Sequence, residues 1–208
     1  MKIFKSLLLI LLLSAAILCF LNETHTTESD IKQSFEVNKP YISVLKDFST
    51  KSSLEKIVEQ NNAVLLDKKW ERLNLEVIRI RKPRQWTVDG RLIFTIETKN
   101  SDLGNQKLEF FQNISLKNNI MLITTGLTTP GKNIILCERT IKFFENDQKD
   151  KTLVEIESKL SVKKLLPKFL IKTMDKKVKE NNLKEIENLR SNILEATKED
   201  SGFSISIH

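Results

Sequence analysis

Residues 165–194, "LLPKFLIKTMDKKVKENNLKEIENLRSNIL", decide the fold, because one apolar face runs along the whole stretch. Pro167 suits the first turn of a helix. Asn182 takes the one position of the face that lacks an apolar residue. The sequence therefore predicts a long C-terminal helix that buries one side. Its apolar stripe consists of Ile171, Met174, Val178, Ile186, Leu189, Ile193 and Ala196.

The middle of the chain changes to a period of two, which is typical of strands with one buried face. The clearest case is "WTVDGRLIFTIET", residues 86–98. Turn-like segments separate the strands, so six of them in succession predict an antiparallel meander. The predicted strands cover about residues 62–81, 86–98, 107–116, 120–127, 133–145 and 153–162.

Three short elements precede the meander. Residues 31–37 favour a short strand, and Pro40 opens a helix with apolar residues at helical spacing. Residues 49–60 predict a second short helix. A half-buried sheet needs a cover, and the long C-terminal helix supplies it.

The order β-α-α-β6-α predicts an α+β fold in which a long C-terminal helix covers an antiparallel sheet. This order resembles the START and polyketide-cyclase-like (SRPBCC, helix-grip) superfamily, by topology and segment length over residues 31–197. The resemblance implies an antiparallel curved sheet wrapped around the long C-terminal helix. "NKPYISVLKDFS", residues 38–49, resembles the entry to the first helix of that fold, and residues 165–194 resemble its closing helix. The resemblance implies a ligand cavity between the sheet and the C-terminal helix.

The N-terminus begins with lysines and continues with an uncharged run from Ser6 to Leu21. It predicts either a cleaved signal peptide or a membrane anchor, since small residues near Ala16 fit cleavage and the remaining apolar length fits a spanning helix. Either way, the lysines predict that the rest of the chain is exported or anchored outside the cytoplasm. The predicted organisation is a targeting segment at 1–21, a polar linker at 22–30, one domain at 31–200 and a tail at 201–208.

Most catalytic chemistry lacks its residues here. His25 lies in the predicted linker, His208 ends the chain, and Cys137 is the one cysteine of the predicted domain. This excludes a histidine-based catalytic triad and the usual zinc sites, so no metal and no cofactor are expected. A carboxylate pair stays open, because Asp and Glu are common. The sequence therefore favours a non-catalytic function.

Arg139 is the polar residue that stands out, because it alternates with apolar residues on its strand. If that face points inward, the guanidinium needs an anionic partner: Glu109, Glu138, another carboxylate or a ligand headgroup. In the alternative, Ile134 and Leu136 point inward and Arg139 lies near the rim.

The residues expected to line a ligand cavity share one property, an inward position in the predicted sheet or helix. Each is equally compatible with simple core packing. The candidates are Trp86, Phe94, Phe110, Arg139, Ile156 and Met174.

The start of the C-terminal helix is strongly basic. Residues 163–184 hold eight lysines against Asp175 and Glu180, a local charge of +6. This polarity opposes the helix macrodipole, so helix stability alone does not explain it. It predicts contact with an anionic membrane surface, and the alternative is a solvated face. The candidate membrane-surface residues are Lys163, Lys164, Lys168, Lys172, Lys176 and Lys177.

The net charge of +7 also raises the possibility of nucleic acid as a partner, but an export signal and the lack of a binding motif speak against it. The leading hypothesis is a START-like domain that binds an apolar ligand, a lipid or an isoprenoid-like molecule, at or near a membrane. One alternative is a membrane-tethered protein-interaction module with a filled core. Another is a cyclase-like or hydrolase-like enzyme that uses carboxylates. Ligand identity and oligomeric state stay open.

Overall fold

The computed structural model describes residues 22–51, 54, 58–59, 63–79, 85–98, 105–117, 119–145 and 150–198. The predicted targeting segment 1–21 and the tail 201–208 lie outside this part. In chain order the elements are β1 (Asn22–Val37), α2 (Tyr41–Lys51), β2 (Ala63–Arg79), β3 (Gln85–Thr98), β4 (Gln106–Lys117), β5 (Ile120–Leu127), β6 (Ile134–Glu145), β7 (Thr152–Pro167), η1 (Lys168–Leu170) and α4 (Ile171–Ala196).

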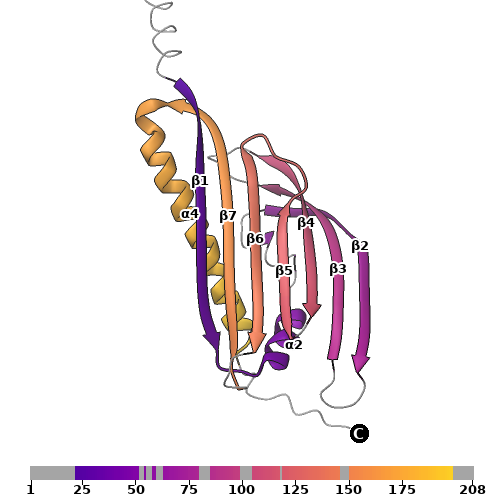
Figure 1. Cartoon of the computed structure of the whole chain (residues 1–208). Coiled ribbons are helices and arrows are strands. Elements are labelled where there is room, and N and C mark those ends of the chain that lie inside the picture. Colours follow the sequence, from indigo (N-terminus) through magenta and orange to yellow (C-terminus); the bar gives the residue numbers. More distant parts are fainter. Residues whose placement is uncertain are drawn as a thin grey trace, which may run out of the picture.

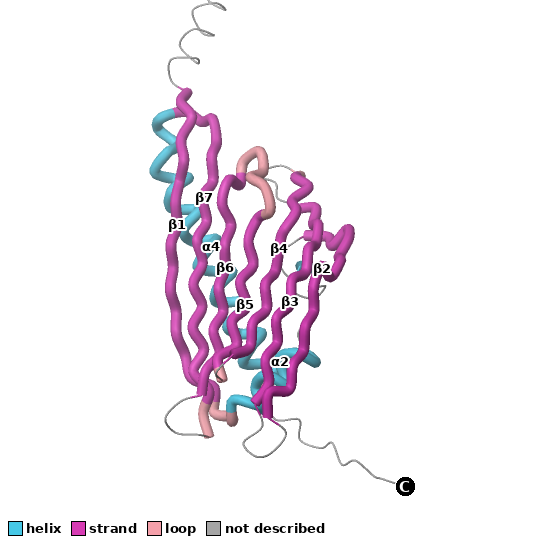
Figure 2. The backbone as a smooth tube through the Cα atoms, turned by 45° about the vertical axis from the view of Figure 1, so that its right-hand side comes forward, coloured by secondary structure: helices cyan, strands magenta, loops and turns pink. Residues whose placement is uncertain are grey.

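The strands form one seven-stranded antiparallel sheet in the order β1-β7-β6-β5-β4-β3-β2 (Figure 1). The first strand of the chain thus lies at one edge of the sheet and pairs with the last strand. Helices α4 and α2 lie on the same face of the sheet, which we call the inner face (Figure 2). This arrangement confirms the predicted α+β, helix-grip fold.

The six predicted strands of the meander are confirmed within a few residues, except that β7 continues to Pro167. Of the predicted second helix, the described residues Leu54, Val58 and Glu59 are helical. Strand β2 is interrupted by register shifts at Leu65/Asp67, Trp70/Arg72 and Val77/Arg79. Each shift displaces the inward and outward positions by one residue, and for this reason β2 shows no simple alternation.

Helix α4 has 26 residues and buries the predicted stripe. Ile171 and Met174, at its start, are half-buried. The prediction that Asn182 fills the missing position is confirmed, because its side chain is 1% exposed. Among the residues that the structure describes, no helix is both long and apolar enough to cross a bilayer. The buried residues of α4 are Val178, Asn182, Ile186, Leu189, Ile193 and Ala196.

The prediction that residues 22–30 form a linker is wrong. They are the first half of β1, which pairs continuously with β7 from Asn22↔Pro167 to Val37↔Thr152. The inward side chains of this half include Thr27 and Ser29, both buried. Backbone pairing needs no apolar side chains, and small polar residues are buried here because α4 offers them hydrogen-bond partners. A pattern of apolar residues cannot detect such a strand.

The main core lies between α4, α2 and the inner face of β1, β7, β6 and β5. It is built from aliphatic and aromatic side chains that alternate along these strands with exposed ones. Phe143, Ile156 and Ile193 are fully buried in it. The other buried members are Phe35, Val37, Tyr41, Val44, Ile123, Ile141, Val154, Ile186 and Leu189.

Asn182 joins three elements in this core. Its Nδ2 donates to Ser29 Oγ of β1 at 3.0 Å, and its Oδ1 accepts from Ser158 Oγ of β7 at 2.7 Å. All three side chains are buried. A buried amide that satisfies two strands at once sets how α4 lies on the sheet, because any other placement would leave polar groups unpaired.

Replacing Asn182 by alanine should therefore destabilise the fold. Asn182→Ala leaves the hydroxyls of Ser29 and Ser158 without their partner, at an expected cost of about 1–3 kcal/mol. Urea denaturation measures the loss in the free energy of unfolding, and the m-value should stay unchanged. The matched control is Asn181→Ala, since Asn181 is exposed on the same turn. A loss no larger than that of the control would show that the bonds to Asn182 contribute nothing.

A second polar contact joins the starts of β1 and α4. Thr27 Oγ1 donates to Asp175 Oδ1 at 2.6 Å, and His25 Nε2 lies 2.8 Å from the same oxygen. The hydrogen bond from Thr27, followed by that of His25, lowers the pKa of Asp175. The prediction that His25 lies in a linker is thus wrong, since it belongs to β1 and contacts the helix.

The depressed pKa of Asp175 gives stability a defined pH dependence. Its contribution is present above the ordinary aspartate pKa of about 3.9 and is lost as the pH falls through the lower folded-state value. Asp175→Asn should lower the Tm at pH 7, and the difference from wild type should shrink below about pH 4. Thermal melts between pH 3 and pH 7 test this, with the exposed Asp30 of β1 changed to Asn as control. A Tm difference independent of pH would contradict the expectation.

Candidate functional site

Helix α4 packs on β1 and β7 and does not cover the part of the inner face that β2, β3 and β4 form. That part carries a second apolar cluster, separate from the main core, which we call the apolar floor: Leu92, Phe94, Leu108 and Phe110. Leu54 packs against it from the segment after α2. The inner face is thus apolar in two areas, of which only one lies under α4.

The centre of the apolar floor is an aromatic pair. Phe94 of β3 and Phe110 of β4 are direct partners in the register. Their rings stack with centroids 5.5 Å apart and an interplanar angle of 11°. Such a pair stabilises the sheet beyond its buried area and forms a flat surface for an apolar contact. Phe94 is 5% exposed and Phe110 is 8% exposed, so other side chains cover the pair in this structure.

A row of polar side chains separates the two apolar areas. Strand register places Gln112, Thr125, Arg139 and Ser158 side by side on β4, β5, β6 and β7. We call these four residues the polar row. Gln112 Nε2 donates to Thr125 Oγ1 at 3.3 Å, and Ser158 binds Asn182 as described above. Polar groups on an otherwise apolar face cost free energy unless they are paired. Four of them in one row therefore point to a structural or a binding role.

Arg139 at the centre of the polar row points inward. Its Nη2 donates to Glu185 Oε2 of α4 at 2.7 Å, and the two side chains are 17% and 41% exposed. The partner is therefore another carboxylate, not Glu109 or Glu138. The alternative is wrong for Leu136, which is 42% exposed. Ile134 does pack against the apolar floor, because a register shift lies between these two residues. The Nε–H of Arg139 is buried and has no hydrogen-bond partner among the described residues.

The far edge of the inner face exposes apolar side chains. Trp70 is 47% exposed and Leu73 is 60% exposed, both on the edge strand β2. They lie over Gly90 of β3, where an added Cβ would meet Trp70 Cζ3 at 3.1 Å and Leu73 Cδ1 at 3.2 Å. Gly90 shares its face with Leu92, so this apolar edge continues the apolar floor.

The free Cys137 of β6 packs against the apolar floor. Burial raises the pKa of its thiol to about 11, with the nearby Arg139 guanidinium acting in the opposite direction. The thiol is therefore neutral at physiological pH, which makes it a weak nucleophile.

The structure brings together only some of the candidate ligand residues. Phe94 and Phe110 touch, and Arg139 lies in the next row. Ile156 belongs to the main core under α4, and Met174 lies half-buried near the start of α4. Trp86 lies opposite Val77 in the sheet, but its side chain is outside the described part.

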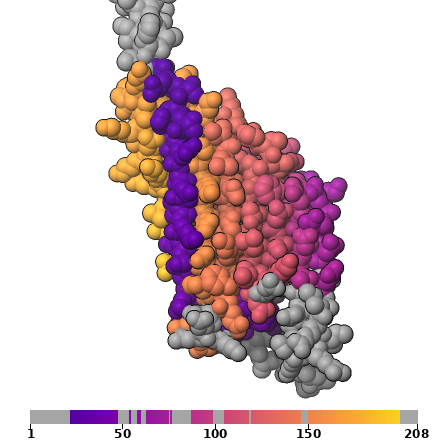
Figure 3. Space-filling view, in the orientation of Figure 1, coloured from indigo at the N-terminus to yellow at the C-terminus, as the bar shows by residue number. Residues whose placement is uncertain are grey.

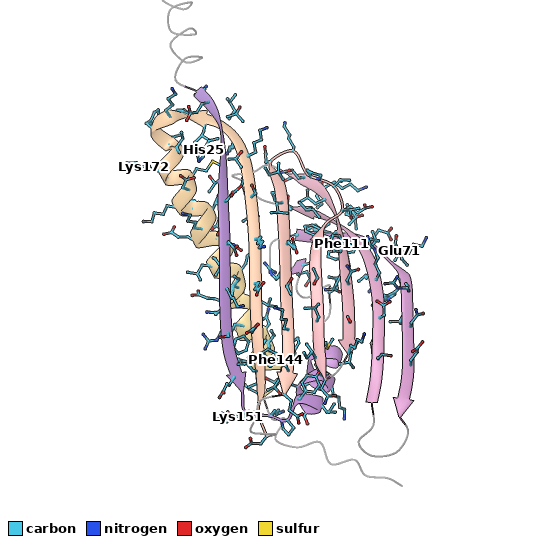
Figure 4. All side chains as sticks on the ribbon, in the orientation of Figure 1. His25, Glu71, Phe111, Phe144, Lys151 and Lys172 are labelled. Carbon is cyan, nitrogen blue, oxygen red and sulfur yellow. The ribbon has the colours of Figure 1, made fainter. Side chains whose placement is uncertain are left out.

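The candidate membrane-surface lysines lie at one end of the molecule. Lys163 and Lys164 end β7, Lys168 opens η1, and three more follow on α4. Figure 4 labels Lys172 at the same end as His25, opposite the end with Lys151. The remaining two are Lys176 and Lys177, both exposed.

Four residues near the candidate site were not predicted from the sequence: Gln112, Thr125, Ser158 and Glu185. Each looks like an ordinary polar residue on its own element. Only the register of four strands, and the contact of α4 with β6, make them neighbours. Alignment of the predicted strands by their inward positions would have been the one available signal.

No protein-family model and no curated protein matches the sequence. Solved structures with a similar backbone include a START superfamily protein from Mycobacterium smegmatis (14% identity, 81% of this chain and 96% of that chain, TM-score 0.43). Others are the ZhuI aromatase/cyclase from Streptomyces sp. R1128 (9%, 82% and 91%, 0.44) and norcoclaurine synthase from Thalictrum flavum (15%, 83% and 96%, 0.43). The fold assignment rests on the strand order and the position of α4.

The raised pKa of Cys137 predicts slow alkylation. In a Cys19→Ser background at pH 7.5, Cys137 should react with a maleimide roughly 100-fold more slowly than an exposed cysteine, because its pKa lies about two units or more above the ordinary value. The same protein unfolded in urea serves as the control and should react at the ordinary rate. Equal rates in the folded and unfolded protein would show that the thiol is accessible.

Proposed function

We propose that this protein binds an apolar molecule of the lipid or isoprenoid class on the inner face of its sheet, over the apolar floor. The observation that carries the proposal is the buried Nε–H of Arg139 beside this floor, which has no hydrogen-bond partner in the part of the chain that the structure describes. A buried donor without a partner costs free energy, and a ligand acceptor would remove that cost.

The neighbours of Arg139 suggest the polar end of such a ligand. Glu185 already compensates much of the arginine charge at 2.7 Å. The Nε–H of Arg139, together with the amide of Gln112 and the hydroxyl of Thr125, suits a hydroxyl, carbonyl or carboxyl oxygen. The apolar body would then lie over Phe94 and Phe110 toward the exposed Trp70 and Leu73, in the usual manner of sites with an apolar lining and few polar groups.

A second candidate function, a protein-interaction module with a filled core, is favoured by one observation. Leu54 packs on the apolar floor, and the two stacked phenylalanines are almost fully covered without a ligand. In that case the exposed apolar edge at Trp70 and Leu73 would meet a protein partner. The two candidates differ in whether a small molecule can replace Leu54.

We also propose that the domain works outside the cytoplasm, exported or anchored at a membrane. The basic start and uncharged run of residues 1–21 support this. This proposal is independent of the ligand.

Native mass spectrometry of the full-length protein, purified in detergent, tests the ligand proposal. A stoichiometric adduct of a few hundred daltons, lost on organic-solvent extraction, is the expected result. Arg139→Met keeps the side-chain volume and removes the donor, so it should weaken rebinding of the extracted molecule about tenfold or more. The control is Arg91→Met, because Arg91 lies on the outer face over the ring of Phe111.

Three results would count against the proposal. A clean mass, from a protein that also takes up no lipid on incubation, would favour the filled-core module. Equal weakening by Arg139→Met and Arg91→Met would remove the polar row from the site. Binding that is unchanged in both variants would do the same.

A further inference from the structure

One end of the molecule projects as a two-stranded arm. Strand β7 pairs with β6 as far as Val162, and one further backbone hydrogen bond joins Lys163 N to Asn133 O at 2.7 Å, whereas the pairing of β7 with β1 continues to Pro167. Residues 22–26 and 163–167 therefore extend past the rest of the sheet, and η1 with the first residues of α4 closes the extension (Figures 1 and 3). We call residues 22–26 and 163–172 the arm.

The arm carries three large apolar side chains that the fold does not use. Leu165 is 65% exposed, Phe169 is 74% exposed and Leu170 is 41% exposed. The short helix η1, which holds two of them, buries no residue. Three such residues within six positions form an apolar tip, and exposed apolar groups that gather in this way mark contact surfaces.

The segment that carries the apolar tip is also rich in lysine. Lys163, Lys164, Lys168 and Lys172 belong to the arm, against the single acid Glu23, which lies 3.8 Å from Lys168. Helix α4 has no acidic residue in its first turn and no side-chain cap at its start. Lysines at a helix N-terminus are unfavourable to the helix dipole, so stability of the fold does not account for this charge.

The covalent path of the chain points to what the tip contacts. Asn22 begins β1 directly opposite Pro167, within the arm. The uncharged apolar run Ser6–Leu21 ends at this same point in the sequence. A bilayer that holds this run would lie next to the arm, and an arm that combines exposed apolar side chains with lysines is complementary to an interface with anionic headgroups.

We propose that the arm docks into the surface of an anionic lipid bilayer. Leu165, Phe169 and Leu170 enter the boundary between headgroups and acyl chains, while the four lysines contact lipid phosphates. The contact between Asp175 and the His25–Thr27 segment holds the arm to α4. The inference rests on the proposed membrane location and does not depend on the ligand.

An environment-sensitive dye on the tip tests the docking. Phe169→Cys is labelled with a nitrobenzoxadiazole dye in the full-length Cys19→Ser protein, where the half-buried Cys137, with its raised pKa, reacts slowly. The protein is reconstituted in vesicles of phosphatidylcholine, with or without phosphatidylglycerol. We expect a blue shift of the dye and its quenching by lipids labelled in the acyl chain, both stronger with phosphatidylglycerol. The matched control is Ile42→Cys, a 68%-exposed apolar residue of α2 at the opposite end (Figure 1).

A second variant separates the charge from the apolar contact. Changing Lys163, Lys164, Lys168 and Lys172 to Gln should abolish the dependence on phosphatidylglycerol, with the Tm unchanged or raised. A dye at position 169 that shifts no more than the one at position 42 would overturn the docking. A shift that is equal in neutral and anionic vesicles would overturn the assignment to an anionic surface. If the dye shows docking but mass spectrometry finds no bound lipid, the ligand proposal is wrong and the docking proposal stands.

Discussion

The structure depends on the packing of one helix against a sheet that is much wider than the helix. A helix with its side chains is about 10–12 Å across, and strands lie about 4.8 Å apart, so one helix covers roughly two strands. Helix α4 accordingly packs on β1 and β7 of a seven-stranded sheet. The remaining inner face is covered by α2 and by residues such as Leu54, and its far edge at Trp70 and Leu73 stays exposed. An apolar part of the inner face that α4 does not cover follows from this mismatch in width.

The polar row serves two purposes along its length. At the α4 end, Ser158 is satisfied by Asn182, and this buried network specifies how the helix lies. Toward β4, the groups are less completely paired, because Arg139 keeps one buried donor without a partner among the described residues. The same row therefore changes from a structural element under the helix to a candidate recognition element beside the apolar floor. Glu185, one turn after Asn182, connects the two parts.

The charge distribution along α4 follows the position of each half of the helix in the molecule and is not favoured by the helix dipole. The basic half lies at the arm, where the chain leaves toward residues 1–21. From residue 185 onward, α4 reaches away from the arm and is acidic, with Glu185, Glu187 and Glu195 against Arg190. A lysine-rich helix start weakens the helix by its unfavourable dipole interaction. In the proposed docking the same lysines become favourable against an anionic surface, so that surface and the helix would make opposite demands on these residues. The contacts of Asp175 with His25 and Thr27 attach the arm to the basic half of α4.

The sequence by itself determined the elements whose signal is local. The stripe of α4, including Asn182, follows from a period of 3.6, and the meander follows from a period of two. Only the tertiary structure decided that residues 22–30 are a strand, since its pairing with β7 places polar Thr27 and Ser29 against a distant helix. It also decided the polar row and the partner of Arg139, because these neighbours depend on the register of four strands and on a contact with α4. Register and long-range pairing are set by the whole packed core, so no single stretch of sequence contains them.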